Sequence, residues 1–557
     1  MTAFLLRITA LADRYTRLSA FILGLVSATG FAPLNLWPLT LLALAGWMAL
    51  VARSTRGWRT FGMGWAFGVG HFALGLNWIA TAFTYQAAMP AWLGWVAVLL
   101  LSLYLAFYPA LTAWGTWALK RYAATSLVAA GSRNPRPNAI PVAAVPTLSF
   151  ILALAAFWTL TEWLRSWIFT GFAWNPLGAI LVPVSLALPA KTVGTYGLSG
   201  LTLLWVGWGL RLAFRWPATF RSKPKSGTFF STVILAPIAF LCVPLLVALL
   251  ANMSVAESSQ RGAVPVTLVQ PNIGQEDKWE GGKADANFAK LARLTIPKDE
   301  TPRLILWPEA AIPDYLEAGY PSVYYDRAPA AARGRLTDLM NAGDLMLLGA
   351  LKLELDRTGD VVGARNAVMT VHSDGTLGPR YDKAHLVPYG EYLPMRSLLS
   401  AIGLSRLAPG DIDFWPGPGA RTLDLGRFGR AGLQICYEII FSGQVVDRAY
   451  RPDFIFNPSN DAWFGAWGPP QHLAQARLRA IEEGLPVLRA TPTGISAVID
   501  ADGRVLDAIP MHKAGRIDSS IPRARAPTPF ARYGNIVPVG LALLLIAAAI
   551  AFRRRGR

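Results

Sequence analysis

Apolar residues form long uninterrupted runs over the first half of the chain, and one more run lies close to its C-terminus. The runs that are long enough, or nearly so, to cross about 30 Å of hydrocarbon as α-helices lie near residues 17–33, 36–52, 61–83, 91–119, 145–169, 192–214, 229–251 and 536–552. This pattern predicts seven membrane-spanning helices, a long gap and one further helix. The first two runs are short and only the Pro33–Pro38 region separates them, so we expect a tight helical hairpin there.

The long gap has a different pattern, in which short β-rich runs alternate with helical ones. The predicted strands are residues 264–270, 303–307, 344–350, 367–372, 432–435, 453–457, 486–490 and 496–500. The predicted helices are residues 283–295, 328–342, 441–450 and 469–484, and the pairs Asp374-Gly375 and Asp502-Gly503 are typical of hairpin turns. Such a succession predicts a layered α/β domain of about 260 residues, which is large enough for a hydrophobic core.

These patterns divide the 557 residues into three parts. We expect a membrane domain with seven transmembrane helices over residues 1–251, a soluble domain over residues 252–530, and a C-terminal transmembrane helix with a basic tail over residues 531–557. The hydrophobic content of 53% agrees with a membrane part beside a soluble one. Because further apolar runs follow the first one at once, we expect that run to stay as a membrane anchor rather than to be cleaved as a signal peptide.

The net charge of +18 could indicate nucleic-acid binding, but the positions of the basic residues point elsewhere. Lys and Arg gather at both termini and in every second loop, whereas the opposite short loops, near residues 84–90 and 170–191, contain only Lys191. Basic loops resist translocation, so both termini should be cytoplasmic and the soluble domain should lie on the other side of the membrane. This placement explains much of the charge, and we expect no nucleic-acid partner.

Two charged residues, Glu162 and Arg165, lie inside the fifth predicted span. An unpaired charge is expensive at that depth. Residues three positions apart share one face of a helix, so the two side chains are expected to meet. They could form an internal ion pair within the bundle or bind a charged headgroup directly, and the ion pair is the simpler interpretation.

The chain has two cysteines in very different surroundings, which makes a disulfide a poor prediction. Cys242 lies in an apolar run. Cys436 lies in Gly432-Leu-Gln-Ile-Cys-Tyr-Glu-Ile-Ile440, where an apolar strand ends and a helix is predicted to begin. A helix N-terminus and neighbouring backbone N–H groups would stabilise a thiolate and, later, an oxyanion. The alternative is a small buried hydrophobic residue at a strand end.

Two further charged residues lie in unusual local sequence. Glu309 ends the run Leu304-Ile-Leu-Trp-Pro-Glu309, which delivers a carboxylate to the C-terminal end of a predicted strand, where ligands collect in open α/β sheets. Lys383 lies in a polar and aromatic loop. Each could instead be an ordinary surface charge. Together with Cys436 they supply a thiol nucleophile, a carboxylate base and a cation that stabilises an oxyanion.

The order of these motifs resembles a known superfamily. The motif Trp-Pro-Glu309 is followed by Lys383-Ala-His-Leu-Val-Pro-Tyr-Gly-Glu391 and then by Ile-Cys436-Tyr-Glu438. This order is similar to the carbon–nitrogen hydrolase (nitrilase) superfamily with its Glu-Lys-Cys triad, and no triad position departs from it. With seven predicted spans before the triad domain and one after it, the chain resembles the apolipoprotein N-acyltransferase family of the bacterial envelope over essentially its full length.

The resemblance implies a fold and an activity. The fold class would be a multi-span α-helical membrane bundle plus an α/β nitrilase-like α-β-β-α sandwich domain that faces the periplasm from the inner (cytoplasmic) membrane. Glu309 would take the thiol proton, Cys436 would attack the ester carbonyl of a phospholipid, and Lys383 would help to hold the oxyanion, with the backbone N–H of Tyr437 as a second donor. The thioester would then acylate the α-amino group of the S-diacylglyceryl-cysteine of an apolipoprotein. A monomer is expected.

The resemblance also implies supporting residues. Glu391 and Glu438 would support the site by orienting Lys383 and the loops beside the thiol. His385 would brace its loop rather than act as the base.

Three aromatic residues complete the implied site. Trp279 would engage the substrate, and Tyr437 and Trp463 would line the acyl pocket. Each of them could equally be an ordinary packed aromatic residue. We expect no metal and no cofactor, because the five His show no ligand spacing and two separated Cys make no zinc framework.

Two other classes of protein remain open. A membrane-tethered amidase or nitrilase-type hydrolase would use the same triad and let water resolve the thioester, although a tether needs only one span. A transporter or scaffold would use the soluble domain only to bind a ligand, and the intact triad argues against it. Residues 310–330 and 392–420 are candidates for mobile arms that touch the membrane.

Overall fold

The computed structural model describes residues 11–85, 90–129, 146–221, 261–278, 280–401, 407 and 413–555. Two compact units make up the chain. The helical unit comprises Met1–Asn77, Val96–Met253 and Tyr533–Arg557, and the sheet unit comprises Trp78–Trp95 and Ser254–Arg532. Trp279 and the predicted span 229–251 lie outside the described residues.

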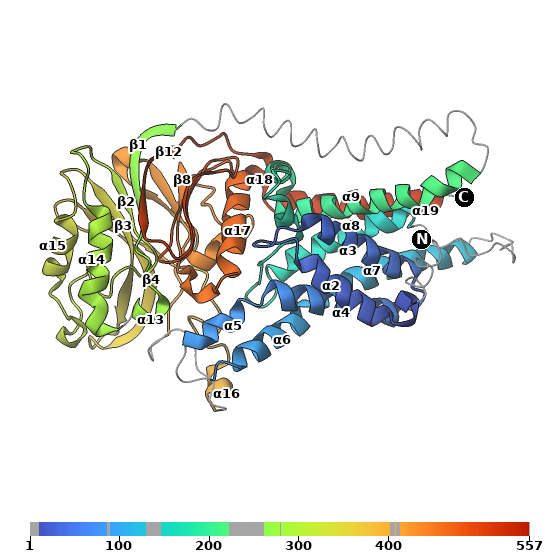
Figure 1. Cartoon of the computed structure of the whole chain (residues 1–557), viewed down its shortest axis with the longest axis horizontal. Coiled ribbons are helices and arrows are strands. Elements are labelled where there is room, and N and C mark those ends of the chain that lie inside the picture. Colours follow the sequence, from blue (N-terminus) through green and yellow to red (C-terminus); the bar gives the residue numbers. More distant parts are fainter. Residues whose placement is uncertain are drawn as a thin grey trace. The chain divides into compact units, whose positions relative to one another are not determined.

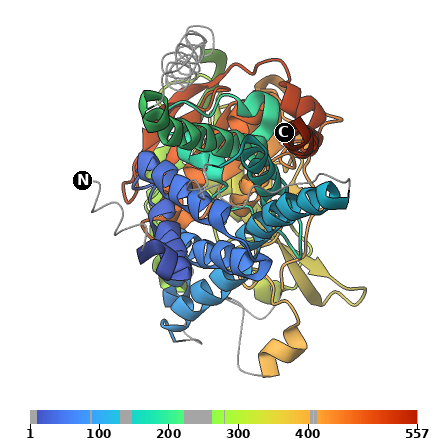
Figure 2. The ribbon, with the colours of Figure 1, turned by 90° about the vertical axis from the view of Figure 1, so that its right-hand side faces the viewer.

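The helical unit consists of apolar helices that pack side by side (Figures 1 and 2). They are α2 (Thr16–Ala28), α3 (Trp37–Arg53), α4 (Gly57–Gly75), α6 (Leu93–Leu105), α7 (Phe107–Ala129), α8 (Leu148–Arg165), α9 (Ala190–Arg221) and α19 (Ile536–Arg555). Small residues let α2 and α4 approach closely, as in membrane bundles. A Cβ on Gly24 of α2 would lie 2.0 Å from the carbonyl oxygen of Phe67 on α4.

Among the described residues, three helices are long and apolar enough to cross a membrane: Leu93–Arg121, Leu148–Arg165 and Ile536–Arg553. A fourth is added if α4 and the segment Ile79–Tyr85, which meet at a bend of 51°, form one span. Helices α2 and α3 are apolar but shorter. The predicted number of seven spans before the soluble domain therefore stays a prediction.

Glu162 and Arg165 form the internal pair that their spacing predicts. Glu162 Oε1 lies 4.0 Å from an Arg165 guanidinium nitrogen, and both side chains are buried. The same Glu162 oxygen accepts the backbone N–H of Leu177 at 2.8 Å, while Arg165 donates to the carbonyl oxygen of Trp174 at 2.9 Å. The pair thus ties the end of α8 to the loop that follows it.

The sheet unit contains two six-stranded sheets. The order in the first is β12 (Gly515–Pro522), β1 (Arg261–Gln270), β2 (Leu304–Leu306), β3 (Leu345–Leu355), β4 (Val361–His372), β5 (Tyr381–Asp382). The order in the second is β11 (Val505–Ile509), β10 (Ser496–Ile499), β9 (Val487–Ala490), β8 (Phe454–Pro458), β7 (Arg430–Leu433), β6 (Thr422–Asp424). The central strands β1-β2-β3 and β7-β8-β9 are parallel, and the outer pairings are antiparallel.

Helices cover the outer faces of the two sheets. Helices α14 (Ala284–Thr295) and α15 (Pro329–Thr337) lie against the first sheet, and α17 (Gly468–Glu483) lies against the second (Figure 1). Asn287, Leu291 and Thr295 of α14 are buried at a spacing of four, the stripe expected of a helix that packs on a sheet. The sheet unit is therefore the α-β-β-α sandwich that the resemblance implies.

Most predicted elements of the sheet unit lie within a few residues of the observed ones. Strands β5, β6, β11 and β12 had no counterpart among the predictions. The helix predicted over residues 441–450 is wrong, because that segment consists of turns and bends. Gly443 adopts a φ of 75°, which a helix does not tolerate, and the hydroxyl of Ser442 donates to Glu482 of α17 at 2.6 Å instead.

Candidate active site

The predicted triad residues follow strands of both sheets. Glu309 comes three residues after β2, Lys383 directly follows β5, and Cys436 comes three residues after β7. All three side chains are buried. Because the carboxyl ends of parallel strands are where α/β sheets collect functional groups, this placement suits a reaction centre.

Glu309 is held by donors from two directions. Its Oε1 accepts the side-chain amide of Asn366 on β4 at 2.6 Å, and its Oε2 accepts the backbone N–H of Asn460 at 2.7 Å. The loop carrying Glu309 also runs against β3 at Gly349, where a Cβ would lie 2.2 Å from the backbone nitrogen of Ala310. A glycine is therefore required there for the carboxylate to reach its position.

Lys383 lies between two carboxylates. Its Nζ donates to Glu391 Oε1 at 2.9 Å and lies 3.6 Å from Glu309 Oε1. Burial alone would lower the pKa of Lys383, but the charges of Glu391 and Glu309 outweigh it and raise that pKa above its usual value. Lys383 is thus a permanent cation, and its side chain is only 1% exposed.

Cys436 lies at a sharp turn. It begins the short 3-10 helix η7 (Cys436–Ile440), and its φ of 52° is in the left-handed region that non-glycine residues rarely adopt. Burial and the charge of Glu309 raise the pKa of the Cys436 thiol well above its usual value, against the opposing effects of Lys383 and of a hydrogen bond from the backbone N–H of Asn460. The resting group is therefore a thiol, which needs a base before it can react.

Glu438 ties the turn at Cys436 to the loop after Lys383. Its Oε2 accepts the N–H of Ile435 at 2.7 Å, and its Oε1 accepts the N–H groups of Ala384 and His385 and the hydroxyl of Tyr381, at 2.7–3.0 Å. Burial raises the pKa of Glu438 to about 7, despite these donors. Glu438 supports the loops and not the ammonium group directly.

Glu391 and His385 lie in the same loop. Glu391 Oε2 accepts the backbone N–H of Val387 at 2.8 Å while Oε1 holds Lys383 and Asn366. The ring of His385 stacks on Phe441 with 3.9 Å between centroids. This stack is compatible with the bracing role expected of His385, which stays a prediction.

The predicted aromatic residues are less closely tied to the triad. Tyr437 is buried in η7, with its ring packed edge-on against Phe441. Trp463 lies in the 3-10 helix η8 (Asp461–Phe464), and its indole N–H donates to the side-chain oxygen of Asn460 at 3.1 Å when that amide is oriented toward it.

Two residues of the site, Asn366 and Lys278, were not predicted from the sequence. Asn366 bridges Glu309 and Glu391, with Nδ2 donating to both carboxylates. Lys278 ends α13 (Gln275–Lys278), and its Nζ donates to the backbone carbonyl of Glu309 at 2.9 Å. Burial lowers the pKa of Lys278 to about 8, although the charges of Glu309 and Cys436 oppose that shift.

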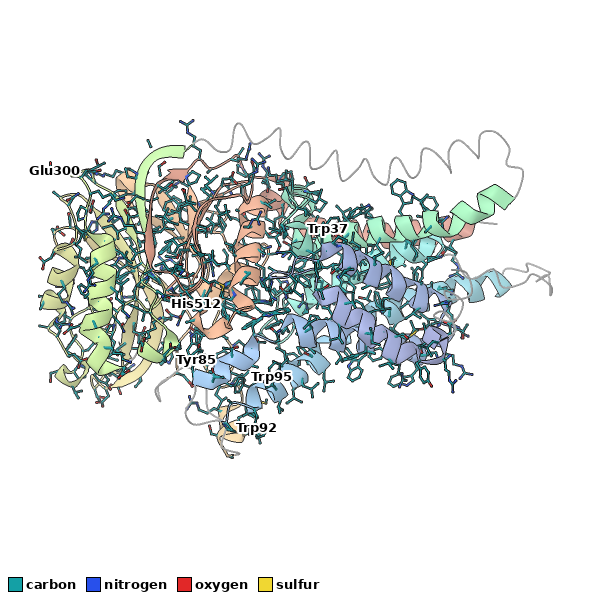
Figure 3. All side chains as sticks on the ribbon, in the orientation of Figure 1. Trp37, Tyr85, Trp92, Trp95, Glu300 and His512 are labelled. Atoms are coloured by element: carbon teal, nitrogen blue, oxygen red, sulfur yellow. The ribbon has the colours of Figure 1, made fainter. Side chains whose placement is uncertain are left out.

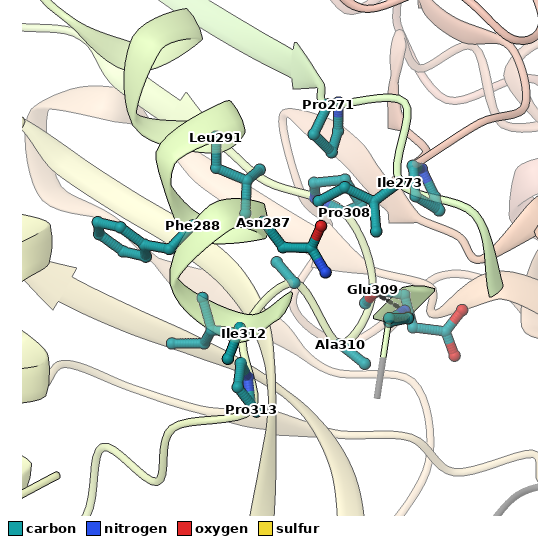
Figure 4. Close-up of a pocket in the computed structure, with 14 residues that line it drawn as sticks. Pro271, Ile273, Asn287, Phe288, Leu291, Pro308, Glu309, Ala310, Ile312 and Pro313 are labelled. Atoms are coloured by element: carbon teal, nitrogen blue, oxygen red, sulfur yellow. Dashed lines mark hydrogen bonds between the residues drawn. The ribbon is translucent and has the colours of Figure 1, made fainter. Parts of the chain in front are cut away.

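A small pocket, partly open to solvent, borders the site on the Glu309 side (Figure 4). Lys278, Glu309 and Asn287 supply its polar groups, and Figure 4 shows the Asn287 amide reaching into it from α14. Its apolar lining includes Pro271, Ile273, Phe288, Leu291, Pro308 and Ile312. Neither Tyr437 nor Trp463 lines this pocket. In the ranges that the structure describes, no three His, Cys, Asp or Glu side chains are grouped as a metal would require.

Solved structures with a related arrangement belong to the nitrilase superfamily. An amidase from Nesterenkonia sp. AN1 is 16% identical, with a TM-score of 0.33, and the match covers 48% of this chain and 94% of the amidase. Nit3 from Saccharomyces cerevisiae is 21% identical, with a TM-score of 0.33, and the match covers 46% of this chain and 90% of Nit3.

Sequence comparisons match both halves of the chain. Residues 23–208 match the apolipoprotein N-acyltransferase N-terminal domain, and residues 265–526 match the carbon-nitrogen hydrolase family. Apolipoprotein N-acyltransferases from Rhodopseudomonas palustris and Bradyrhizobium diazoefficiens are 33% and 34% identical, over 96% and 97% of this chain and 95% of each relative. The enzyme of that name from Nitrosomonas europaea is 33% identical over 96% of this chain and 98% of its own length. With both domains matched and relatives aligned almost end to end, the chain belongs to the apolipoprotein N-acyltransferase family.

Proposed function

We propose that the protein transfers an acyl chain from a phospholipid, through a thioester on Cys436, to the α-amino group of the S-diacylglyceryl-cysteine at the N-terminus of apolipoproteins. It is an N-acyltransferase by family and an integral membrane protein by its apolar helices. The observation that carries the mechanism is the buried set of a carboxylate, an ammonium group and a thiol, with Lys383 Nζ 3.6 Å from Glu309 Oε1.

The first half of the reaction forms the thioester. Glu309 takes the proton of the Cys436 thiol, and the thiolate attacks the ester carbonyl carbon of the phospholipid. The Lys383 ammonium and the Tyr437 backbone N–H stabilise the resulting oxyanion. When the tetrahedral intermediate collapses, the C–O bond breaks and the lysophospholipid oxygen takes the proton back from Glu309.

The second half of the reaction transfers the acyl chain from Cys436 to the acceptor. The neutral α-amino group attacks the thioester carbonyl, and the same donors stabilise the second oxyanion. Glu309 takes a proton from the attacking nitrogen, the C–S bond breaks, and the thiolate of Cys436 recovers that proton. Cys436 is buried, so a thioester formed there is shielded from water.

The placement in the cell follows from the charge pattern and from the substrates. We place the protein in the inner membrane as a multi-pass protein, with both termini cytoplasmic and the sheet unit facing the periplasm. The donor and the acceptor both carry acyl chains, so an enzyme that draws them from the outer leaflet of that membrane gains from being embedded in it.

The test follows a labelled acyl chain from the phospholipid donor to the peptide acceptor. Purified protein is incubated with a phospholipid that carries an isotope-labelled acyl chain and with a synthetic diacylated lipopeptide. We expect one labelled chain on the peptide, linked as an amide at its N-terminus, and none with the Cys436→Ala variant or with a peptide whose N-terminus is acetylated. Labelled free fatty acid without acylated peptide would instead indicate the hydrolase that shares this triad.

A further inference from the structure

A second buried polar cluster lies beneath the turn at Cys436, and the mechanism above does not use it. His472 of α17, Asp461 of η8 and Arg489 of β9 come from three separate elements and are at most 1% exposed. Buried charges of this kind are costly unless they are paired and hydrogen-bonded. A cluster of this kind is expected to hold a neighbouring part of the structure in place.

The cluster reaches Cys436 through the imidazole of His472. Its Nε2 lies 3.0 Å from the backbone carbonyl oxygen of Cys436, and its Nδ1 lies 3.0 Å from both Asp461 Oδ1 and an Arg489 guanidinium nitrogen. A carbonyl oxygen only accepts hydrogen bonds, so Nε2 carries a proton and donates it.

The other ring nitrogen is set by the charges around it. Burial and the positive charge of Arg489 lower the pKa of His472, while the hydrogen bonds to Asp461 and to the Cys436 carbonyl oppose that shift. Asp461 in turn holds the guanidinium through both of its carboxylate oxygens, at 2.6 and 2.7 Å. The Asp461–Arg489 ion pair, which contacts Nδ1 from two sides, thereby fixes the orientation of the imidazole.

His472 donates a hydrogen bond to the Cys436 carbonyl, and the same peptide unit carries the N–H of Tyr437. A trans peptide is planar, and its C=O and N–H point in opposite directions. Cys436 has a φ of 52°, a strained value that persists only where the surroundings hold it. A hydrogen bond on the Cys436 carbonyl therefore fixes the direction of the Tyr437 N–H on the other side of the same plane.

We propose that His472, held by Asp461 and Arg489, is a positioning residue that locks the Cys436–Tyr437 peptide so that the Tyr437 N–H is aimed at the developing oxyanion. This inference rests on the proposed function, since the oxyanion arises when a carbonyl substrate is attacked. Removal of one preorganised oxyanion donor typically lowers the rate about 100- to 1000-fold. The thiol itself would keep its place, because Glu438 holds the turn at Ile435 independently.

The test compares two reactions of the same thiol in purified full-length protein. Acylation by phospholipid passes through an oxyanion, and intact-mass spectrometry measures its rate. Alkylation by iodoacetamide needs the thiolate but no oxyanion. For His472→Phe we expect acylation to fall by roughly 100-fold while alkylation stays within about twofold. In His472→Gln the amide N–H reaches the place of Nε2. This variant should therefore be acylated at least tenfold faster than His472→Phe.

The controls separate positioning from folding. His372→Phe, at the exposed end of β4, should leave both rates unchanged. If His472→Phe loses its cooperative melting transition, the comparison passes to His472→Gln and His472→Asn, because the shorter Asn amide does not reach the Cys436 carbonyl. The acylation rate of His472→Gln should then exceed that of His472→Asn by about tenfold.

Three results would overturn the inference. His472→Phe could acylate at the wild-type rate, its acylation and alkylation could fall in parallel, or the Gln and Asn variants could acylate equally. In each of these cases wild-type protein still forms the acyl adduct, so the proposed function survives. If wild-type protein itself forms no adduct with phospholipid, the proposed function fails and this inference fails with it.

Discussion

Two lysines beside Glu309 differ in their electrostatic surroundings. Lys383 is paired with Glu391 and lies near Glu309, so it stays charged at any physiological pH. Lys278 donates to the backbone carbonyl of Glu309, and burial lowers its pKa to about 8. A second positive charge near Cys436 therefore disappears just above neutral pH.

Substitution of Lys278 by Met should change the reactivity of Cys436 in a pH-dependent way. Below pH 8 the wild-type Lys278 is charged and favours the thiolate, so iodoacetamide alkylation of wild-type protein should be faster than that of Lys278→Met, by up to about tenfold, the effect of one pKa unit. Above pH 8 the wild-type lysine is neutral and the two rates should converge. Stopped-time alkylation followed by mass spectrometry from pH 6 to about pH 9.5 measures the ratio over the range in which this pKa matters.

The exposed Lys290→Met on α14 is the matched control and should follow the wild type. A rate ratio that stays constant across the pH range would show that Lys278 does not titrate there. The same lowered pKa means that the unfolded chain binds the extra proton between about pH 8 and 10.5, so the stability that burial of Lys278 removes is regained as pH rises through that window.

Some residues of the site could be predicted from the sequence, and others became visible only in the structure. Glu309 and Cys436 were predicted because motifs mark strand ends, and Lys383 because of the motif in its polar and aromatic loop. Asn366 and His472 were not predicted, because Asn366 lies inside a mostly buried strand and His472 on a helix face of mixed polarity. Their importance comes only from the atoms that the fold brings to them, namely two carboxylates for Asn366 and a strained carbonyl for His472.

At the scale of elements, the contact between β3 and the loop after β2 sets the position of the base. Gly349 of β3 lies so close to this loop that a Cβ would be 2.2 Å from Ala310 N and 2.6 Å from Glu309 Cα. Ala310 also has a φ of 45°, so the loop is already tightly constrained. The neighbouring atoms are backbone, which cannot move aside as a flexible side chain would.

Substitution of Gly349 by Ala should both destabilise the sheet unit and displace Glu309. We expect a loss of about 1–3 kcal/mol, the usual cost of overpacking, and a clear fall in acyl-enzyme formation. Thermal unfolding followed by tryptophan fluorescence, together with intact-mass spectrometry, measures both.

Gly334→Ala in α15 is the matched control, because a Cβ there meets nothing within 4 Å. Since Ala is the better helix former, this variant should be more stable by up to about 1 kcal/mol, with unchanged acylation. A Gly349→Ala protein as stable and as active as the wild type would contradict the close approach described for this loop.

Elements were predicted well where burial is continuous and poorly where it is not. The prediction for β3 stopped at residue 350, but the strand continues to Leu355 through Leu351-Lys-Leu-Glu-Leu, an alternating half-buried segment. Strand β12 is also half-buried and has no long apolar run. Apolar runs identify the buried middle of a sheet, while its length and outer strands depend on pairing with neighbours.

At the scale of the whole molecule, a short piece of the apolar half of the sequence is part of the sheet unit. Within Trp78–Trp95, the ring of Trp78 packs edge-on against Phe464, and that of Tyr85 packs against Trp463, at centroid distances of 4.7 and 5.8 Å. Trp92 and Trp95 of the same piece are largely exposed (Figure 3). The span predicted over residues 61–83 includes part of this piece, and hydropathy, which measures composition, does not reveal the partners against which its residues pack.

The central claim for the whole molecule is that a phospholipid chain is stored on Cys436 between the two half-reactions. Intact-mass spectrometry of purified wild-type and Cys436→Ala protein after incubation with phospholipid alone tests it most directly. We predict that the wild type gains the mass of one acyl chain, that hydroxylamine removes it, and that a diacylated lipopeptide discharges it. An adduct that also forms on Cys436→Ala, or acylated peptide made without any adduct on the wild type, would contradict the account.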